Sequence, residues 1–341
     1  MDTMRAVVVL AAGERPRRGR VPAPVPGPHQ ALVRVTRTAA CASAVRAAAA
    51  RPEGPRAFPL VPGHGGHGPV VALGPGVTGV RIGDELGSTW VASACGTCAL
   101  CLTGHESLCP AVAVTGVTVH GSWADLMLVD TRYAARVPGG CDPVAAAAVL
   151  SGGVSAVRAL RSTGAQAGQW LVVSGIGDVG HQAVQHAVAR GVRVVAVDDD
   201  EGRLALARKH GAELTVNAAA QDASREVRTR TDGGAHAALL TGAAPDVRDA
   251  LALVRPGGTL TLTGVPAGTL PLGVPALVGR GLTVRGATPG DRRDAVEALD
   301  LLARGVVEPT VTVRPFDAVE SALADLEAGA VEGSLVLDLS D

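Results

Sequence analysis

Aromatic residues are scarce in this chain of 341 residues, which contains three Trp, two Phe and one Tyr. Its cores must therefore be built mostly from Val, Leu and Ala side chains. Net charge is also nearly absent, because 31 Lys and Arg residues balance 32 Asp and Glu residues to give a formal net charge of −1. A chain this close to neutrality offers no electrostatic case for binding nucleic acid or a membrane surface.

Long hydrophobic runs are missing as well. No apolar run reaches the roughly 18 residues that a membrane-spanning helix requires. The first apolar run, residues 4–12, is too short and too poorly flanked for a secretory signal and is typical of a first strand. We therefore expect a cytoplasmic protein that does not associate with membranes. The length of the chain allows two domains with sizeable cores.

Cysteines are few but clustered, and four of the six fall between positions 95 and 109. They are Cys95, Cys98, Cys101 and Cys109, with the spacing C-x2-C-x2-C-x7-C. In a reducing compartment this spacing favours a tetrahedral thiolate zinc site over disulfides. Four thiolates would leave no open coordination position, so the predicted zinc is structural. Disulfides or free thiols are the alternatives.

The stretch from Trp170 to Asp198 predicts a dinucleotide-binding unit. An apolar run is followed by the glycine turn Gly-Ile-Gly-Asp-Val-Gly, a helical pattern and a second apolar run that ends in an acid. In this context the turn and the helix N-terminus are predicted to bind the pyrophosphate of a cofactor. The residues predicted to contact it are Gly175, Gly177, Val179 and Gly180. The alternative is an ordinary strand-helix-strand unit with a glycine turn.

Acidic residues at the end of this unit indicate which cofactor it binds. Asp198 is predicted to accept hydrogen bonds from the adenosine ribose hydroxyls. Asp199, Asp200 and Glu201 follow it and would repel a 2′-phosphate, which favours NAD over NADP. Asp178 lies in the turn itself, where its carboxylate suits the helix dipole but opposes a bound pyrophosphate. We expect weaker cofactor binding from Asp178, not its loss.

The remaining pattern predicts an α/β protein. Short strand-like runs at 6–10, 31–36 and 126–129 indicate a β-rich N-terminal part. A helical stretch of small residues, 143–160, is interrupted by Gly152 and Gly153. Further strand-like runs, each followed by a helix or turn, predict a parallel, doubly wound sheet. These runs are 214–216, 237–241, 259–263 and 282–285, and the chain closes with a strand at 334–339.

These motifs resemble the zinc-type alcohol dehydrogenase branch of the medium-chain dehydrogenase/reductase superfamily. The resemblance covers essentially the whole chain and depends on the four cysteines, Pro62-Gly63-His64, residues 74–84 and the glycine-turn unit. It implies a GroES-like catalytic domain of residues 1–150 and 288–341, with a zinc lobe at residues 93–111, and a Rossmann NAD-binding domain of residues 151–287. It also implies an active site in the interdomain cleft, a small-molecule substrate, and a homodimer or homotetramer.

The resemblance adds three cofactor contacts. Arg203 matches a basic residue over the adenosine ribose, Arg292 an arginine directed at the pyrophosphate, and Ser155 a hydroxyl beside the nicotinamide. Trp90 and Trp123 match positions that line the substrate pocket. Plain core packing is the alternative for both tryptophans.

The sequence departs from the family at the catalytic zinc. The usual Cys-His-Thr-Asp reads Cys41-Ala42-Ser43-Ala44, which keeps the cysteine ligand and the hydroxyl beside the substrate oxygen. The usual Gly-His-Glu reads Gly63-His64-Gly65, which keeps the histidine ligand and loses the acid. Ser151 replaces the third ligand, a cysteine, and Arg46 takes the place of a proton-relay histidine.

These losses weaken the predicted metal site at Cys41 and His64. A catalytic zinc normally has three protein ligands plus water, and a neutral hydroxyl such as that of Ser151 is a poor zinc ligand. Losing the acids that orient the ligands lowers metal affinity further. His67 and His120 are candidates to complete the site, with ordinary structural histidines as the alternative.

We therefore predict an NAD(H)-dependent oxidoreductase without a firmly bound catalytic zinc. Its substrate would be an activated C=N or C=C bond, as in an iminium or enone, or a carbonyl. Ser43, Ser151, His67 and Arg46 are the candidate hydrogen-bond donors or acids. Two alternatives are a zinc-dependent alcohol or aldehyde dehydrogenase with a weakened metal site, and a catalytically inactive NAD-binding scaffold.

Overall fold

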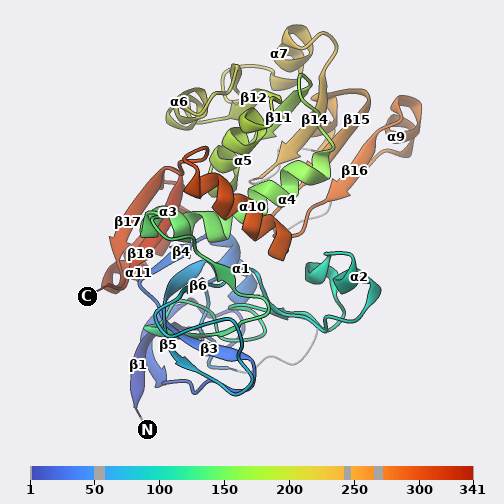
Figure 1. Cartoon of the computed structure of the whole chain (residues 1–341). Helices are drawn as coiled ribbons and strands as arrows, with labels where there is room; N and C mark the ends of the chain where they lie inside the picture. Colours follow the sequence, from blue (N-terminus) through green and yellow to red (C-terminus); the bar gives the residue numbers. More distant parts are fainter. Residues whose placement is uncertain (1, 50–57, 242–246, 265–271, 341) are drawn as a thin grey trace. The chain divides into compact units, whose positions relative to one another are not determined.

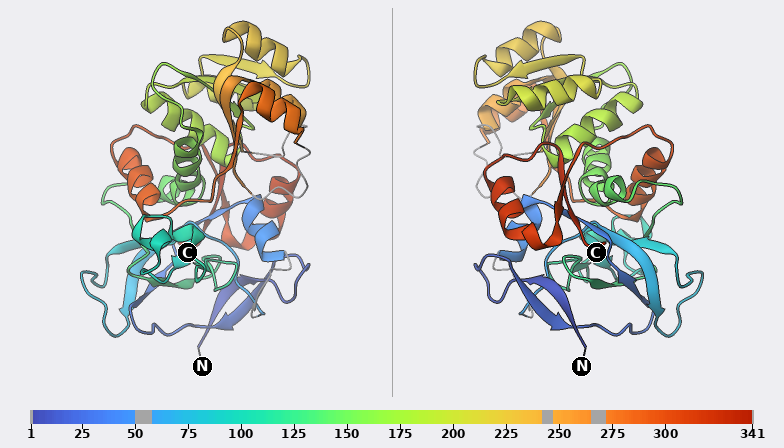
Figure 2. Two further views of the ribbon diagram at one scale, coloured as in Figure 1. Left: turned by 90° about the vertical axis from the view of Figure 1, so that its right-hand side faces the viewer. Right: turned by 90° about the vertical axis from the view of Figure 1, so that its left-hand side faces the viewer.

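A computed structural model describes residues 2–49, 58–241, 247–264 and 272–340 of the chain (Figure 1). The chain divides into two units. Unit 1 comprises Met1–Val154, Gly290–Gly305 and Pro309–Asp341, and unit 2 comprises Ser155–Pro289 and Val306–Glu308. Both ends of the chain therefore belong to unit 1 (Figure 2).

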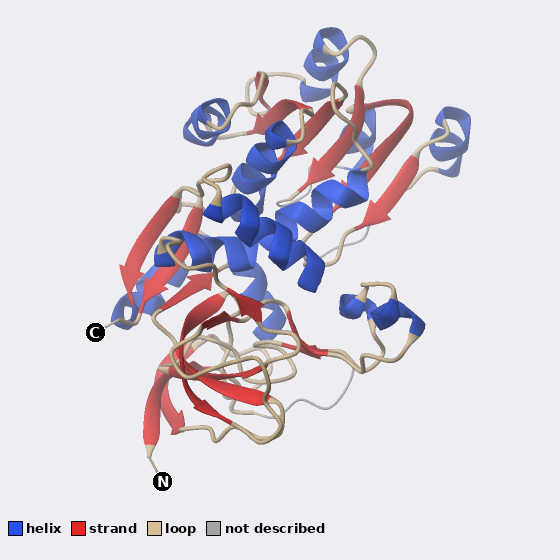
Figure 3. Cartoon of the chain, viewed as in Figure 1, coloured by secondary structure: helices blue, strands red, loops and turns tan. Residues whose placement is uncertain are grey.

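Unit 1 is rich in strands (Figure 3). They are β1 (Thr3–Val8), β2 (Arg17–Pro22), β3 (Gln30–Arg34), β4 (Arg37–Ala40), β5 (Gly66–Leu73), β6 (Glu85–Gly87), β7 (Val91–Ser93), β8 (Ala113–Val114), β9 (Leu126–Asp130), β10 (Ala135–Arg136), β17 (Val311–Pro315) and β18 (Ser334–Asp338). Eight form one sheet in the order β10-β6-β5-β4-β18-β17, with β3 pairing both β5 and β9. The predicted β-rich N-terminal part is confirmed, and the C-terminal strand completes its sheet.

Helices of unit 1 bring the functional residues to this sheet. They are α1 (Ala42–Ala49), α2 (Ala99–Leu102), η1 (Glu106–Leu108), α3 (Pro143–Ala148), η2 (Val149–Gly153), α10 (Arg292–Ala303), η3 (Phe316–Ala318) and α11 (Val319–Glu327). The predicted interruption at Gly152 and Gly153 is a π-helical turn, η2, that runs directly into α4 (Val154–Thr163). The glycines therefore widen the helix instead of ending it, as π-turns commonly do at functional sites.

The long helical run formed by α3, η2 and α4, Pro143–Thr163, is the one described helix that is long and apolar enough to cross a membrane. The expectation from the sequence that no apolar stretch is long enough to span a membrane was therefore wrong. However, 72% of its apolar window is buried inside the structure. Core packing accounts for the apolar character of this helix.

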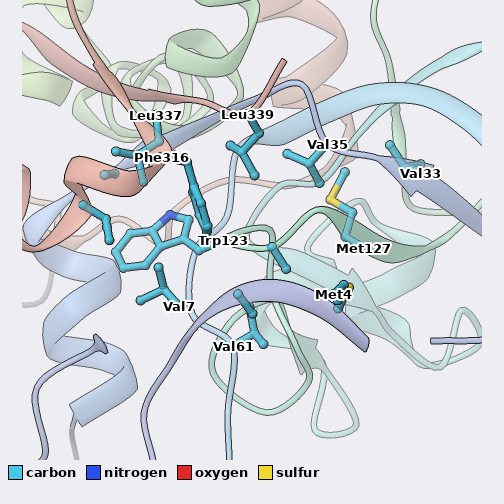
Figure 4. Packing of buried hydrophobic residues seen from close by; sticks show 14 of the residues in the cluster. Met4, Val7, Val33, Val35, Val61, Trp123, Met127, Phe316, Leu337 and Leu339 are labelled. Carbon is cyan, nitrogen blue, oxygen red and sulfur yellow. The ribbon is translucent and has the colours of Figure 1, made fainter. Parts of the chain in front are cut away.

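The core of unit 1 surrounds Trp123, whose side chain is fully buried among Val7, Val61, Phe316 and Leu337 (Figure 4). Its indole Nε1 donates a hydrogen bond of 2.9 Å to the carbonyl oxygen of Ala39, so the one polar atom of the ring is satisfied. Trp123 is a core residue, and its assignment to the substrate pocket was wrong.

Unit 2 contains a six-stranded parallel sheet in the order β13-β12-β11-β14-β15-β16. Its strands are β11 (Trp170–Ser174), β12 (Arg193–Asp198), β13 (Leu214–Asn217), β14 (Ala235–Leu240), β15 (Val254–Leu262) and β16 (Thr283–Gly286). Its helices, besides α4, are α5 (Asp178–Ala189), α6 (Glu201–Lys209), α7 (Ala223–Arg230), α8 (Val247–Ala252) and α9 (Val274–Arg280). Numbered from β11, the order is 3-2-1-4-5-6, the doubly wound order of dinucleotide-binding domains. The predicted parallel, doubly wound sheet is confirmed.

The central strand β11 is buried on both faces, which explains its uninterrupted apolar sequence. Leu171 and Val173 pack into one hydrophobic cluster, and Trp170 and Val172 into the other. The carboxyl end of β11 is the point where the strand order reverses, and ligands of such sheets bind outside this point.

Candidate functional site

The glycine turn joins β11 to α5 as the sequence predicts. Gly175 has a positive φ of 89°, a conformation that favours glycine. A Cβ atom on Gly180 would lie 1.9 Å from the carbonyl oxygen of Gly175, so only glycine lets the helix approach the turn this closely. A Cβ on Gly177 would meet no atom within 4 Å, which leaves open space beside the N-terminus of α5. Val179 packs against the adjacent hydrophobic cluster.

Asp198 ends β12 with its carboxylate turned toward this loop. Its Oδ2 accepts a 2.6 Å hydrogen bond from the Ile176 amide, and its Oδ1 accepts bonds from the amides of Asp199 and Asp200. The guanidinium of Arg203 lies 3.8 Å from Oδ1. Burial raises the pKa of the Asp198 carboxyl, while the Ile176 amide opposes that shift. Asp198 therefore holds the glycine turn in addition to its expected role at the ribose.

Two further polar side chains, those of Asp178 and Thr241, lie at the glycine turn. Asp178 is the first residue of α5, so its carboxylate lies in the first turn of the helix whose amides would bind the pyrophosphate. Thr241, which follows β14, donates its hydroxyl to the carbonyl oxygens of Ser174 and Gly175. Sequence reasoning did not single out Thr241; a polar residue directly after a parallel strand was the available signal.

The ligand atoms of the four clustered cysteines all lie within 4.8 Å of one another. Among the described residues, no other group of three or more His, Cys, Asp or Glu side chains comes together in this way. The sulfurs of Cys95 and Cys101 are 3.8 Å apart, those of Cys98 and Cys109 3.9 Å, and those of Cys95 and Cys109 3.6 Å. A tetrahedron of Zn–S bonds places sulfurs about 3.8 Å apart. These residues fit a structural zinc. All six cysteines of the chain are free thiols, so the disulfide alternative is not what the structure contains.

The thiols of this cluster differ in acidity. Hydrogen bonds from Thr97 and from the backbone amide of Cys98 lower the pKa of the Cys95 thiol to about 6. Burial raises the pKa of the Cys101 thiol to about 12. A dication at their centre would offset this cost, because it favours the thiolate form of all four residues.

A second constellation in unit 1 contains the residues expected at the catalytic centre. The Cys41 sulfur lies 3.1 Å from Ser43 Oγ, 3.9 Å from His64 Nε2 and 3.9 Å from Ser151 Oγ. Cys41, His64 and Ser151 are each at most 6% exposed. The loop before α1 supplies Cys41, and the π-turn η2 supplies Ser151. The structure thus brings together one thiol, one imidazole and two hydroxyls.

No acid accompanies this donor set at the two positions where the family has one. Ala44 is buried, and Gly65 has a positive φ of 83°. A Cβ at Gly65 would lie 2.9 Å from the Cβ of Ser151 and 3.2 Å from the carbonyl oxygen of Ala147, so an acid at this position would be crowded as well as strained. One thiol, one imidazole and neutral hydroxyls do not match the three strong protein ligands usual for a catalytic zinc.

His67, His120 and Arg46 do not join this donor set. The imidazole of His67 bonds through Nε2 to the Pro143 carbonyl oxygen at 2.8 Å and through Nδ1 to Glu85 at 3.3 Å, so both its nitrogens bridge elements of unit 1. His120 Nδ1 accepts a hydrogen bond from the Val61 amide. Neither histidine forms a ligand group with Cys41 and His64 in the described chain. The structure therefore does not bring His67 or His120 together with Cys41 and His64. Arg46 is exposed on α1.

Trp90 stays close to the candidate catalytic residues, unlike Trp123. Its ring meets that of His64 edge to face, with centroids 5.3 Å apart. The side chain of Trp90 is only partly buried. It therefore remains a candidate for a residue that contacts substrate.

The two remaining residues implied by the resemblance have clear partners. Ser155 Oγ donates to the Pro289 carbonyl oxygen at 3.1 Å. Arg292, at the start of α10, donates to Glu106 in the cysteine lobe and to the Arg132 carbonyl oxygen. Sequence reasoning missed Glu106, which accepts from Arg292, and Asp291, which accepts a hydrogen bond from the Ser107 amide of the same lobe. The Asp-x-x-Asp pattern at the start of α10 was a capping signal that could have drawn attention to Asp291.

Comparison with known proteins agrees with this geometry. Residues 27–139 match the alcohol dehydrogenase GroES-like domain, and residues 179–304 match the zinc-binding dehydrogenase domain. The chain is 38% identical to an alcohol dehydrogenase of Moraxella sp. (strain TAE123) over 98% of this chain and 99% of the relative. It is 39% identical to an alcohol dehydrogenase of Rhizobium meliloti (strain 1021) over 99% of each. A solved NAD-dependent alcohol dehydrogenase superposes with a TM-score of 0.90 at 29% identity, over 98% of this chain and 100% of the other.

The doubly wound unit, the GroES-like unit and these relatives define an oxidoreductase. The chain belongs to the zinc-type alcohol dehydrogenase family of medium-chain dehydrogenases/reductases. The predicted family and fold class are therefore confirmed.

Proposed function

We propose that this chain is an NAD(H)-dependent oxidoreductase that reduces an activated double bond without a firmly bound catalytic zinc. The substrate class is an iminium or enone, or a carbonyl that is already polarised. The observation that carries the proposal is the donor set at Cys41, where Ser151 stands in place of a third strong ligand and Ala44 and Gly65 replace the supporting acids.

The chemistry follows from what this donor set can still do. NADH supplies the hydride when bound, and the proposed contacts for it are the glycine turn, Asp198 and Arg203, with Arg292 at the pyrophosphate and Ser155 at the nicotinamide as the family resemblance implies. A zinc ion acting on a carbonyl contributes several kcal/mol of transition-state stabilisation, or about a thousandfold or more in rate. A substrate whose carbon is already electrophilic needs less of this help. The hydroxyls of Ser43 and Ser151 can donate hydrogen bonds to the substrate heteroatom, while the partly buried side chain of Trp90 lies against His64 in the same region.

A zinc-dependent alcohol or aldehyde dehydrogenase with a weakened site is the second candidate. Its support is that His64 Nε2 and Ser151 Oγ each lie 3.9 Å from the Cys41 sulfur, close to the separation of about 3.5 Å between ligands of a tetrahedral zinc. A catalytically inactive NAD-binding scaffold is the third. The buried carboxylate of Asp198 and its neighbour Arg203 argue only against a scaffold that binds no cofactor, and turnover of a substrate is what separates an NAD-binding scaffold from the two enzyme candidates.

Three further parts belong to this proposal. We infer one structural zinc per chain at the four-cysteine lobe and a small-molecule substrate. We also infer a homodimer or homotetramer located in the cytoplasm, on the strength of the family alone.

Metal analysis tests the proposal directly. We expect one zinc per chain in the purified wild-type protein, and two per chain after Ser151→Cys, which would restore a thiolate beside Cys41 and His64. Ser162→Cys is the matched control, because it adds a thiol on α4 without these partners and should leave the count at one. Two zinc ions per wild-type chain, with one lost in Cys41→Ala, would restore the ordinary zinc mechanism.

Kinetics separate the same candidates. With NADH and an enone or iminium, Cys41→Ala should lower kcat/KM by less than about tenfold on the proposed mechanism. A zinc-dependent reaction should lose about a thousandfold or more. Absence of NADH binding in a fluorescence titration at millimolar cofactor would defeat both enzyme candidates and the NAD-binding scaffold. NADH binding without turnover of any of these substrates would point to the scaffold.

A further inference from the structure

The cysteine lobe and the start of α10 are joined by direct contacts within unit 1. The Arg292 guanidinium donates to Glu106 Oε1 from Nε at 2.8 Å and from Nη2 at 2.6 Å. The Ser107 amide donates to Asp291 Oδ1 at 2.6 Å, and Asp291 is the N-cap residue of α10. Asp294 completes the cap by accepting from the Asp291 amide. One turn of the lobe therefore holds both the cap and the first residue of α10.

Because the Glu106 carboxylate is buried, it needs a positively charged partner. The Glu106 side chain is only 4% exposed, and its Oε2 is a buried atom without a hydrogen-bond partner in the described chain. A buried carboxylate is costly unless a cation compensates it, and Arg292 is the cation that contacts it. The Arg292 side chain is in turn 45% exposed, and its guanidinium carbon lies 4.8 Å from the centre of the Tyr133 ring. Glu106 thus holds the Nε and Nη2 edge of Arg292, while part of the Arg292 side chain stays accessible.

The position of Glu106 depends on the cysteines. Glu106 begins the short turn η1, and its carbonyl oxygen accepts a hydrogen bond from the Cys109 amide. The Cys109 sulfur lies 3.6 Å from that of Cys95 and 3.9 Å from that of Cys98. The lobe has little apolar core of its own, since Leu102 and Leu108 are exposed. A lobe of this kind depends on its metal for order.

We propose that Glu106 is a positioning residue: the metal held by the four cysteines fixes Glu106, and Glu106 fixes the Arg292 guanidinium at the start of α10. The metal of the lobe then acts on cofactor binding as well as on stability. This last step rests on the proposed function, in which Arg292 contacts the cofactor phosphates.

Hydrogen exchange on the full-length, zinc-loaded protein tests the coupling without reference to activity. Chelation of the wild type should raise exchange both in the lobe, 93–111, and at the start of α10, 291–295. Glu106→Gln keeps the size and one acceptor oxygen but loses the charge. It should show fast exchange at 291–295 while zinc content stays at one per chain, and Glu106→Asp should recover part of the protection.

Kinetics supply the functional readout. Glu106→Gln should raise KM for NADH about tenfold and change kcat less than twofold, because a charge-assisted contact that orients a binding group is lost. Glu213→Gln is the control, since it breaks an exposed ion pair with Arg193 in unit 2 and should change neither parameter.

Two results would overturn the coupling. One is chelation that speeds exchange in the lobe and leaves 291–295 unchanged. The other is a Glu106→Gln variant with wild-type exchange at α10. If NADH does not bind at all, the proposed function fails, and the exchange measurement still decides whether the lobe controls α10.

Discussion

At the scale of single residues, the glycines of the glycine turn have different environments. Gly180 packs against the Gly175 carbonyl oxygen so closely that a Cβ would lie 1.9 Å from it. Gly177 faces open space and has an ordinary negative φ of −87°. The structure therefore separates a glycine that the fold requires from one that leaves room for a ligand.

Alanine substitutions should expose this difference. Gly180→Ala forces α5 away from the turn and should cost about 2–3 kcal/mol of unfolding free energy. Gly177→Ala should cost less than about 1 kcal/mol, as an N-cap substitution, yet weaken NADH binding about tenfold or more, because its methyl group occupies the open space. Urea denaturation and fluorescence titration of both variants measure these effects. A Gly177→Ala protein with unchanged NADH affinity would contradict the assignment of this space to the cofactor.

Prediction of single residues succeeded where function is local in sequence. The four cysteines converge as their spacing predicted, and Asp198 reaches the glycine turn. The sequence did not indicate that the ring of His67 would contact Glu85 and the carbonyl oxygen of Pro143, which is 76 positions away. No spacing rule reports which strand or helix will face a lone histidine.

At the scale of elements, helix α5 contains a fully buried histidine beside the glycine turn. His181 Nδ1 lies 2.9 Å from the Gly177 carbonyl oxygen, and its ring centroid lies 5.9 Å from that of His210. Burial lowers the pKa of His181 to about 4. The folded protein thus keeps this imidazole neutral in a range where the unfolded chain protonates it.

This shift makes the stability of unit 2 dependent on pH. Because the folded-state pKa lies below the unfolded value of 6.5, the stabilisation is complete above pH 6.5 and is lost as pH falls toward 4, by roughly 3 kcal/mol in total. His181→Gln should remove most of this dependence. The remainder should come from His210 and His236, whose pKa values burial also lowers. Urea denaturation at pH 7.5 and 4.5 measures how far the free energy of unfolding falls between these pH values. An equal fall in the wild type and in His181→Gln would refute the assignment of this pH dependence to His181.

The helix from α3 to α4 illustrates what element-level prediction missed. Two adjacent glycines indicated an interruption, but the backbone continues through the π-turn η2. The wider turn positions Ser151 Oγ 3.9 Å from Cys41. Packing against the rest of unit 1 favoured this geometry over the local glycine signal.

At the scale of the whole molecule, the two units divide the proposed tasks. Unit 1 contains both cysteine-based constellations, and unit 2 contains the glycine turn and Asp198. A cofactor that binds unit 2 should stabilise the folded protein in proportion to the logarithm of its concentration over its dissociation constant.

NADH and NADPH should therefore differ in a thermal denaturation experiment. NADH at a hundredfold excess over its dissociation constant contributes about 2.7 kcal/mol, and should raise Tm by about 5 °C or more. NADPH at the same concentration should give little shift, because Asp198, Asp199 and Asp200 repel its 2′-phosphate. Equal shifts for the two cofactors would contradict the predicted preference for NAD.

The sequence by itself determined the fold class, the four-cysteine cluster and the glycine turn, because each is encoded by neighbouring residues whose periodicity and spacing are visible along the chain. The family followed from the resemblance that these motifs carry. Only the tertiary structure decided that Ser151 meets Cys41 across 110 positions and that Arg292 meets Glu106 across 186. Such contacts depend on how strands pair and helices pack over long loops. The free energy of that packing is a property of the assembled core and not of any segment alone.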